Sequence, residues 1–257
     1  MKGYGMFFKK ELMENVRTHR LFVMCIIFLI FGFMSPLFAK ITPMLLTSLS
    51  GNEEVISSLQ IPEPTALDSY AQFFKNIGQM GMLAMLLIFS GMLSKEIQKG
   101  TLIPVLTRGL PRSSVILAKF TASSLIWTVC YLLSFGVVYV YTIFLFPSMN
   151  LYHLVFAVFA GWMFGIFLLA LFLWMSCAMK GSYGGLLGTM LVLAALLFLQ
   201  MIPDIQKFNP MLLISDNVAM LQPGYPMGHA YMAMGISVVA MVIFMFFAIT
   251  LFKRKQL

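Results

Sequence analysis

The side chains that could carry chemistry are concentrated in one segment, residues 95–112, and the chemistry that they indicate is docking rather than catalysis. The segment alternates charged with aliphatic residues and is interrupted by glycine and proline. Lys95–Lys99 predicts a short helix that ends at Gly100, because glycine is favoured just past a helix end. Pro104 should begin or kink a second short piece. Such an element suits binding in a groove of a partner protein. Composition alone favours the alternative, a solvated basic loop that only orients the chain in the membrane.

Motifs for catalysis, nucleotide binding and metal binding are absent from the sequence. It contains no Gly-x4-Gly-Lys-Ser/Thr phosphate-binding loop, no His-Glu-x-x-His and no Gly-x-Ser-x-Gly. His19, His153 and His229 are far apart, whereas a metal site needs clustered ligands. Serines inside the apolar runs have no neighbouring base that could activate them. We therefore expect no enzymatic activity, no bound cofactor and no metal in this chain, and any ATP would be bound by another polypeptide.

The composition is that of a membrane protein. Hydrophobic residues make up 60% of the 257 residues and charged residues only 10%, against roughly 45–50% and about 25% in soluble domains. The three cysteines, Cys25, Cys130 and Cys177, each lie inside an apolar run, and their odd number and wide spacing favour buried packing residues over disulfides or a metal site. We expect an all-α polytopic membrane protein that forms one domain over residues 1–257.

Six runs are apolar enough to cross a bilayer as helices, which takes roughly 17–25 residues. All the charged residues, 17 basic and 9 acidic, lie outside these runs. A chain without charges at membrane depth is poorly suited to ion-coupled transport. The predicted transmembrane helices are Leu21–Ala39, Ile77–Ser94, Phe120–Phe146, Leu151–Met179, Gly184–Ile202 and Ala230–Phe252.

The distribution of positive charge predicts the orientation. Fourteen of the 17 lysines and arginines lie in the amino terminus, the loop 95–119, the turn after the fourth run and the carboxyl terminus, and only Lys40, Lys75 and Lys207 lie on the other side. By the positive-inside rule both termini face the cytoplasm. The loops 40–76 and 203–229 are then outside, and the apolar stretch Met211–Ile214 predicts a short re-entrant or surface helix there.

Two further patterns concern helix surfaces. Phe8, Leu12 and Val16 recur every four residues before the first run, which predicts an amphipathic helix in the cytoplasmic interface rather than a plain basic flank. Glycines four apart, Gly161 with Gly165 and Gly184 with Gly188, allow close helix approach. We expect them to serve packing within the chain rather than a dimer seam.

The sequence resembles a known family, the membrane subunits of bacterial type 2 ATP-binding-cassette (ABC) exporters. Glu96-x3-Gly100-Thr101, followed by Arg112 and Lys119, is similar to the family's Glu-(x)n-Gly-Thr…Arg…Lys pattern after the second span. Further similarities lie in 62–76 and in 8–11, and beyond Lys119 only the spans correspond. The resemblance covers the layout of the whole chain, but its motifs are confined to the first half.

The resemblance implies a mechanism. The loop after the second span would contain a coupling helix that docks on a cytoplasmic ATPase, with Glu96, Gly100 and Thr101 in the contact. Two membrane subunits, this chain and a second copy or a paralogue, would pair in the bacterial cytoplasmic membrane. Two ATPase subunits carrying ATP and Mg²⁺ would drive them between inward-open and outward-open states. The family's short helices between spans five and six would correspond to 203–229.

The predicted function is thus export of an apolar or amphipathic substrate (a peptide, lipid or drug) by a permease with no ATPase of its own, in contact with the lipid bilayer and with no nucleic acid. An ATP-independent carrier or channel is the alternative, but it would need acids or a ring of charge at membrane depth. A membrane-embedded enzyme would need a His, Asp or Glu constellation there, and the apolar runs contain none.

Overall fold

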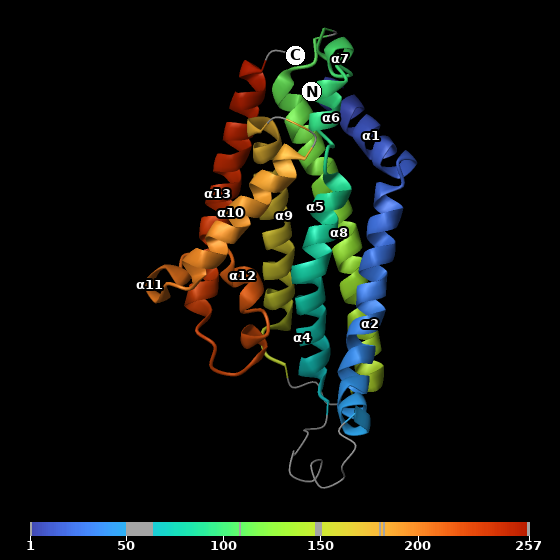
Figure 1. Cartoon of the computed structure of the whole chain (residues 1–257), viewed down its shortest axis with the longest axis vertical. Coiled ribbons are helices and arrows are strands. Elements are labelled where there is room, and N and C mark those ends of the chain that lie inside the picture. Colours follow the sequence, from blue (N-terminus) through green and yellow to red (C-terminus); the bar gives the residue numbers. More distant parts are fainter. Residues whose placement is uncertain are drawn as a thin grey trace.

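The computed structural model describes residues 2–49, 64–107, 109–146, 151–179, 181 and 183–255, which fold into helices joined by turns. Figure 1 shows an elongated bundle with both termini at the same end, beside α6 and α7. The elements are α1 (Lys2–Arg17), α2 (Arg20–Leu49), α4 (Ala66–Asn76), η1 (Ile77–Gly81), α5 (Met82–Phe89), α6 (Ser94–Gln98), α7 (Ile103–Thr107), α8 (Arg112–Leu145), α9 (Leu154–Ala178), α10 (Gly184–Gln200), α11 (Pro203–Gln206), α12 (Leu212–Ser215), η2 (Ala219–Leu221) and α13 (Met227–Arg254).

Five helical segments of the described chain are long and apolar enough to cross a membrane: 20–42, 66–98, 112–145, 154–178 and 227–254. A sixth apolar helix, α10, has 17 residues. These segments coincide with the six predicted runs, so the all-helical fold class is confirmed. The four residues 147–150 between the third and fourth predicted runs also predict a tight turn between two helices, but they lie outside the described residues.

Two segments that were expected as loops are partly helical. The outer loop was expected to extend from Lys40 to Asn76, but α2 continues through Leu49 and α4 already begins at Ala66. The start of α4 is stabilised by a capping box, in which the backbone N–H and hydroxyl of Thr65 donate to the Asp68 carboxylate, each at 2.8 Å. Helix α4 alternates polar with buried apolar residues, so no continuous apolar run marks it in the sequence.

The predicted cytoplasmic loop 95–119 is also shorter than expected, because its last part is helical. Helix α8 begins at Arg112 rather than at Phe120, directly after Pro111. The two short helices predicted in the loop are present as α6 and α7. Gly100, just past α6, has φ +64°, a conformation that glycine adopts without strain.

The core lies where α8 and α9 pack closely. The indole of Trp127 on α8 donates a hydrogen bond to the carbonyl of Trp162 on α9 at 3.0 Å. A Cβ atom at Gly165 would overlap the Trp127 ring, and one at Gly161 would lie 2.8 Å from the hydroxyl of Tyr131. The predicted role of this glycine pair in packing within the chain is therefore confirmed.

The second glycine pair also serves contacts inside the chain, because a Cβ at Gly188 would lie 2.9 Å from the sulfur of Met175. Cys25 is half-buried, and Cys130 and Cys177 are buried. Cys25 of α2 and Cys130 of α8 lie together, with their sulfur atoms 3.2 Å apart, a proximity that their separation in the sequence does not indicate.

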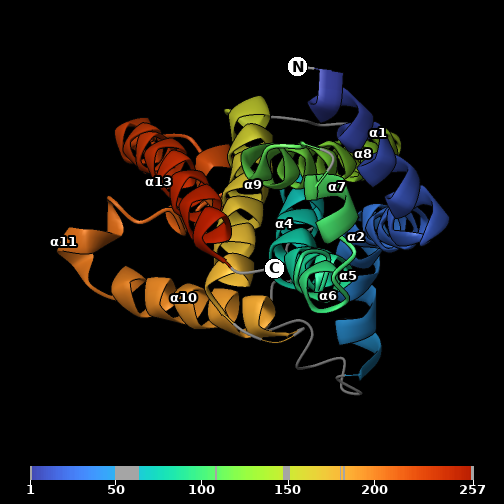
Figure 2. The same cartoon turned by 90° about the horizontal axis from the view of Figure 1, so that it is seen from above.

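The segment between α10 and α13 contains three short helices. Figure 2 shows α10, α11 and α13 on the side of the bundle opposite α1 and α2. The apolar stretch predicted to form a helix is present as α12, and its Leu212 and Leu213 are buried in the core. The side-chain amide of Asn209 donates to the carbonyl of Leu196 at 2.7 Å, which ties this segment to α10.

Candidate coupling site

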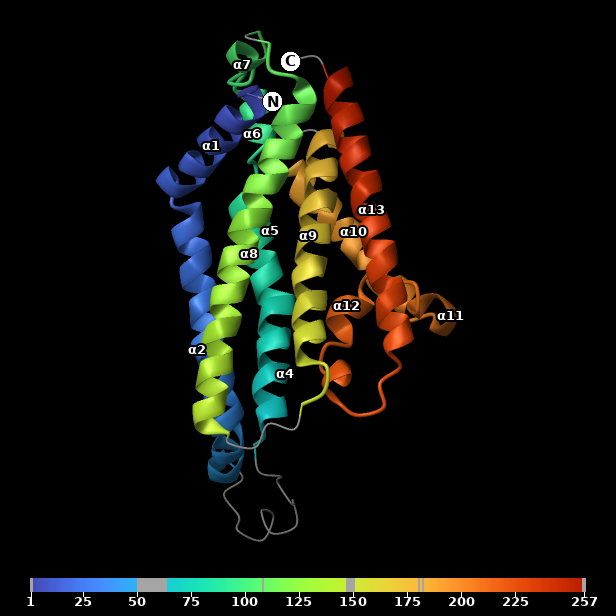
Figure 3. The ribbon, with the colours of Figure 1, turned by 180° about the vertical axis from the view of Figure 1, so that it is seen from behind.

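The end of the bundle that carries both termini is built from α1, α6, α7 and the first third of α8. Figure 3 shows α1 lying obliquely across this end, beside α8 and α6. These three elements meet at Lys119, whose side chain has no exposed surface. Its ammonium nitrogen lies 3.0 Å from both carboxylate oxygens of Glu11 and in ion-pair contact with Glu96, 2.8 Å from Oε2.

Lys119 was predicted to lie at the end of the loop 95–119, whereas the structure places it inside a helix. The early start of α8 places the residue inside a helix, on the face that packs against α1 and α6. A buried lysine is tolerated only with compensating charge. Here one carboxylate comes from α1 and one from α6, with 2% and 12% of their side-chain surfaces exposed.

The sequence of α1 explains how its carboxylate reaches the interior. Phe7, Glu11 and Asn15 recur every four residues and are all buried, so they form the face of α1 that packs on the bundle. The Asn15 amide donates to the Glu11 carbonyl at 2.9 Å. The predicted apolar face of this helix is different: Phe8 and Leu12 are half-buried and Val16 is exposed.

Lys10 extends the network towards solvent. Its ammonium nitrogen lies 2.8 Å from Glu14, 3.1 Å from Glu96 and 3.3 Å from Glu11. Burial by itself lowers the pKa of Lys10, but the hydrogen bond to Glu14 and the charges of Glu11 and Glu96 outweigh it and raise that pKa well above its ordinary value. Lys10 therefore stays charged under all physiological conditions.

Glu14 shows the complementary shift. Burial raises its pKa, but the hydrogen bond and charge of Lys10, with smaller contributions from Lys119 and Arg20, outweigh burial and bring the pKa below its ordinary value. The carboxylate of Glu14 is therefore ionised at neutral pH.

Three carboxylates, those of Glu11, Glu14 and Glu96, offer oxygens within 4.8 Å of one another, a spacing that a metal site could use. Two ammonium groups already lie between them at ion-pair distance. These cations neutralise most of the negative charge that a divalent ion would need. The donor set is that of an ion-pair network, which we call the Lys119 network: Lys10, Glu11, Glu14, Glu96 and Lys119.

The structure separates the three residues predicted to contact an ATPase. Glu96 points its carboxylate inwards, into the Lys119 network. Gly100 ends α6, and Thr101 follows with its side chain exposed. The backbone N–H of Thr101 donates to the carbonyl of Glu96 at 3.2 Å. Glu96 thus closes the turn that exposes Thr101, while its side chain lies in the Lys119 network.

The exposed edge of this end consists of side chains in and around α6 and α7. The exposed residues are Lys95, Gln98, Lys99, Thr101, Ile103, Pro104 and Thr107. Leu102 points the other way and is buried among Phe7, Val115 and Ile116. The segment 95–107 thus presents a mixed polar and apolar edge outwards while it is anchored from within.

Arg112, the third charged residue of the predicted motif, fixes the carboxyl end of α13. Its guanidinium donates to the carbonyls of Phe252, Lys253 and Lys255 at 3.3, 2.9 and 2.7 Å. The last carbonyls of a helix have no partner within it, and a cation there also matches the helix dipole. Arg112 therefore joins the first turn of α8 to the last turn of α13.

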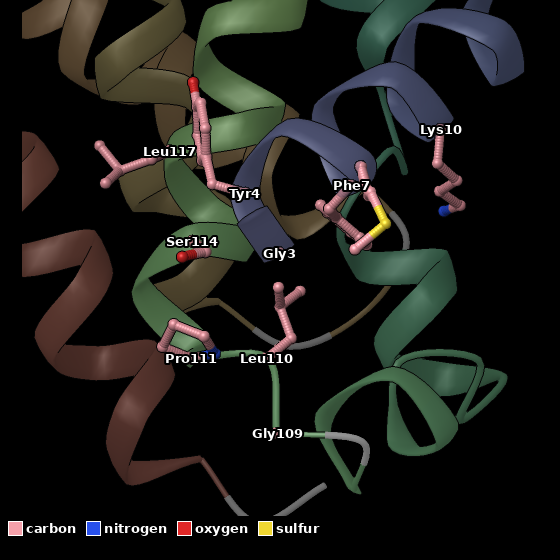
Figure 4. Close-up of a pocket in the computed structure, with 10 residues that line it drawn as sticks. Gly3, Tyr4, Phe7, Lys10, Gly109, Leu110, Pro111, Ser114 and Leu117 are labelled. Carbon is pink, nitrogen blue, oxygen red and sulfur yellow. The ribbon is translucent and has the colours of Figure 1, made fainter. Parts of the chain in front are cut away.

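An open cavity of about 910 Å³ lies between α1 and the segment that leads into α8. Figure 4 shows Tyr4 and Phe7 on one side and Leu110, Pro111 and Ser114 on the other. Its lining is mainly apolar. The hydroxyl of Tyr4 is hydrogen-bonded to that of Thr121 at 2.8 Å, which holds the amino end of α1 against α8.

The comparison with known families covers almost the whole chain. The model of the ABC-2 family transporter proteins matches residues 6–257. The chain belongs to the ABC-2 transporter family. Among curated proteins, none matches it. The predicted family is thereby confirmed: the chain is a multi-pass membrane permease of an ABC transporter.

Membership of the ABC-2 family accounts for the absent phosphate-binding loop, because these permeases carry no catalytic ATPase domain and membrane subunits of ABC transporters generally pair with ATPase subunits. Sequence reasoning identified Glu96, Arg112 and Lys119 by their pattern but missed Lys10, Glu11 and Glu14. A signal was available in the sequence. Phe7, Glu11 and Asn15 are four residues apart, so Glu11 lies on the same helix face as the apolar Phe7.

Proposed function

We propose that this chain is the export permease of an ABC transporter, moved by ATP that a separate subunit hydrolyses. It crosses the membrane six times, with both termini in the cytoplasm. Two copies, or this chain and a paralogue, pair around the path of an apolar or amphipathic substrate. Two cytoplasmic ATPase subunits, which carry ATP and Mg²⁺, bind the edge formed by α6 and α7. The positive-inside charge distribution supports this orientation.

One observation carries the proposal: an exposed mixed edge at 95–107 is held from behind by buried ion pairs. A loop that served only as a connection would need no such anchorage. In this arrangement Gly100 and Thr101 form the contact with the ATPase, while Glu96 supports it from the inner side. The shape fits the docking of a short rigid element in a groove.

The proposal also explains why no ionisable group is needed along the substrate path. Neither α9 nor α10 contains a charged residue, whereas proton-coupled or ion-coupled carriers place acids or histidines at membrane depth. Among the described residues, the buried charges lie at the end of the bundle beside α1, where the ammonium groups of Lys10 and Lys119 contact carboxylates. Their placement favours a mechanical role over ion coupling.

The test is gentle isolation of the protein from bacterial membranes. We expect a polypeptide with a phosphate-binding loop to co-purify and to supply all the ATPase activity, while the separated permease hydrolyses none. Thr101→Arg should release that polypeptide without loss of the folded permease, whereas Ile205→Arg on α11, an exposed position away from this edge, is the control and should leave it bound. Solute transport by the permease alone in ATP-free vesicles would contradict the proposal.

A further inference from the structure

We propose that Lys119 is a positioning residue for coupling: it fastens the α6–α7 segment and α1 to α8, so that movement of the ATPase at the segment becomes movement of α8. This inference rests on the proposed function. It concerns the connection behind the docking edge rather than the edge itself. The ion pairs of Lys119 with Glu11 and Glu96 carry it.

The argument begins with the backbone of the segment. Gly91, Gly100 and Gly109 all have positive φ, at 74°, 64° and 87°, and they divide the region between α5 and α8 into two short helical pieces. Helices of five residues are not stable alone and take their position from what they pack against. The direction in which α6 points is therefore set by its contacts and not by its backbone.

Two kinds of contact hold the segment. Leu93 and Leu102 are buried in an apolar cluster that includes Phe7, Val115 and Ile116. Apolar packing is not directional and tolerates sliding. The contact between Glu96 and Lys119 is different, because it places a carboxylate 2.8 Å from a fully buried ammonium group. Separating the two would leave the buried Lys119 with Glu11 as its remaining partner and Glu96 with the half-exposed Lys10. Loss of a contact between buried charges is costly, so sliding of the segment on α8 is penalised.

Lys119 also binds α1 through both oxygens of Glu11 at 3.0 Å. One side chain of α8 thus joins two elements that lie on its surface. Lys10, half exposed, connects the same two carboxylates from the solvent side. The three elements therefore move as one body, with Lys119 at its centre.

A movement of this body would reach the far end of the bundle through α8, which is continuous over 34 residues from Arg112 to Leu145. Near that far end the Thr142 hydroxyl is hydrogen-bonded to Ser69 of α4 at 2.7 Å. Helices are stiff along their axes, and coupling between distant sites is carried by such packed rigid elements. A displacement of α6 would thereby displace α8 and, through the Thr142–Ser69 hydrogen bond, α4 as well.

The test uses the full permease–ATPase complex with a fluorophore on the outer half of α8. The three cysteines are replaced, and a single cysteine is introduced by Leu133→Cys, at a half-exposed position, and labelled with bimane. The emission change between the nucleotide-free and the ATP–vanadate-trapped complex is recorded. In Lys119→Met we expect ATPase binding and hydrolysis to persist while this change falls about fivefold or more, as for loss of an allosteric coupling.

Three variants separate positioning from stability. Lys119→Arg keeps the charge and should retain the emission change. Lys9→Met removes an exposed lysine of α1 that lies outside the Lys119 network, and it should also retain the emission change. The triple variant Glu11→Gln, Glu96→Gln, Lys119→Met leaves no buried charge uncompensated, so we expect its thermal stability to recover while the emission change stays small. If Lys119→Met does not fold, the triple variant carries the test by itself.

Two results would overturn the inference, and they differ from the failure of the proposed function. One is an undiminished emission change in Lys119→Met or in the triple variant. The other is a loss in Lys9→Met as large as that in Lys119→Met. If no ATPase accompanies the wild-type permease, the proposed function fails, and this inference with it.

Discussion

The two ends of the bundle are built on different principles. At the end with the termini, short helices are held by the Lys119 network, in which each buried charge has an opposite charge within 3.3 Å. At the other end, α12 and η2 are held mainly by buried leucine and methionine side chains. There the amide of Asn217 is buried with no hydrogen-bond partner among the described residues.

The difference has a physical consequence. Ion pairs in a buried site fix both distance and direction, whereas apolar contacts fix only proximity. Under the proposed function, the first end receives a mechanical input, which needs a fixed direction. The second end then lets substrate leave and can tolerate repacking. The first end should therefore fail when charge is removed, and the second when apolar volume is removed.

The largest effect is expected from Lys119→Met. Breaking a buried ion pair on one side leaves uncompensated carboxylates and costs about 3–5 kcal/mol. Thermal unfolding in detergent should show this loss, and Lys119→Arg should recover most of it. If the free energy of unfolding falls by only about 1 kcal/mol or less, as for loss of an exposed ion pair, the network does not hold this end together.

At the other end Leu213→Ala should have the next largest effect. Leu213 is fully buried against the core, and truncation of a buried leucine costs about 2–5 kcal/mol. The loss of stability in Leu213→Ala should not change with ionic strength, so measurements in high salt sharpen the comparison with Lys119→Met. Ile205→Ala on α11, where the side chain is exposed, is the control and should be nearly neutral.

A smaller effect is expected from Tyr225→Phe, which removes the hydroxyl that donates to the Asp216 carboxylate at 3.0 Å. Loss of one such hydrogen bond, to a charged but partly exposed acceptor, costs about 0.5–1.5 kcal/mol. Chemical unfolding of the variant and the wild type measures it. A cost equal to that of Leu213→Ala would mean that polar contacts dominate this end too.

The smallest effect is the response to pH. The pKa of Glu14 lies below its ordinary value of 4.5 in the folded protein, so its stabilising contribution is present above pH 4.5 and is lost as the pH falls through the lower, folded value. The difference in melting temperature between wild type and Glu14→Gln should therefore be constant at neutral pH and shrink below pH 4.5. A difference that grows on acidification would contradict this sign.

The sequence predicted the six long apolar helices, but it predicted neither all of their ends nor the Lys119 network. Continuous apolar runs and charge distribution predict the six helices, and glycine chemistry predicts the end of α6 at Gly100. The start of α4 was missed because Asp68 and Lys75 interrupt its apolar pattern. Asp68 lies in the first turn of this helix and Lys75 in its last turn. The burial of Lys119 could not be inferred, because its partners come from positions 11 and 96 and only tertiary packing brings them together.

Photo-crosslinking tests most directly whether a separate ATPase binds the segment 95–107, as proposed. A photoreactive side chain is placed at position 101, which is exposed at the docking edge, and, as the control, at position 205 on α11. In intact membranes we predict a crosslink from position 101, and not from position 205, to a polypeptide with a phosphate-binding loop. Crosslinks from position 101 to lipid alone would contradict the account.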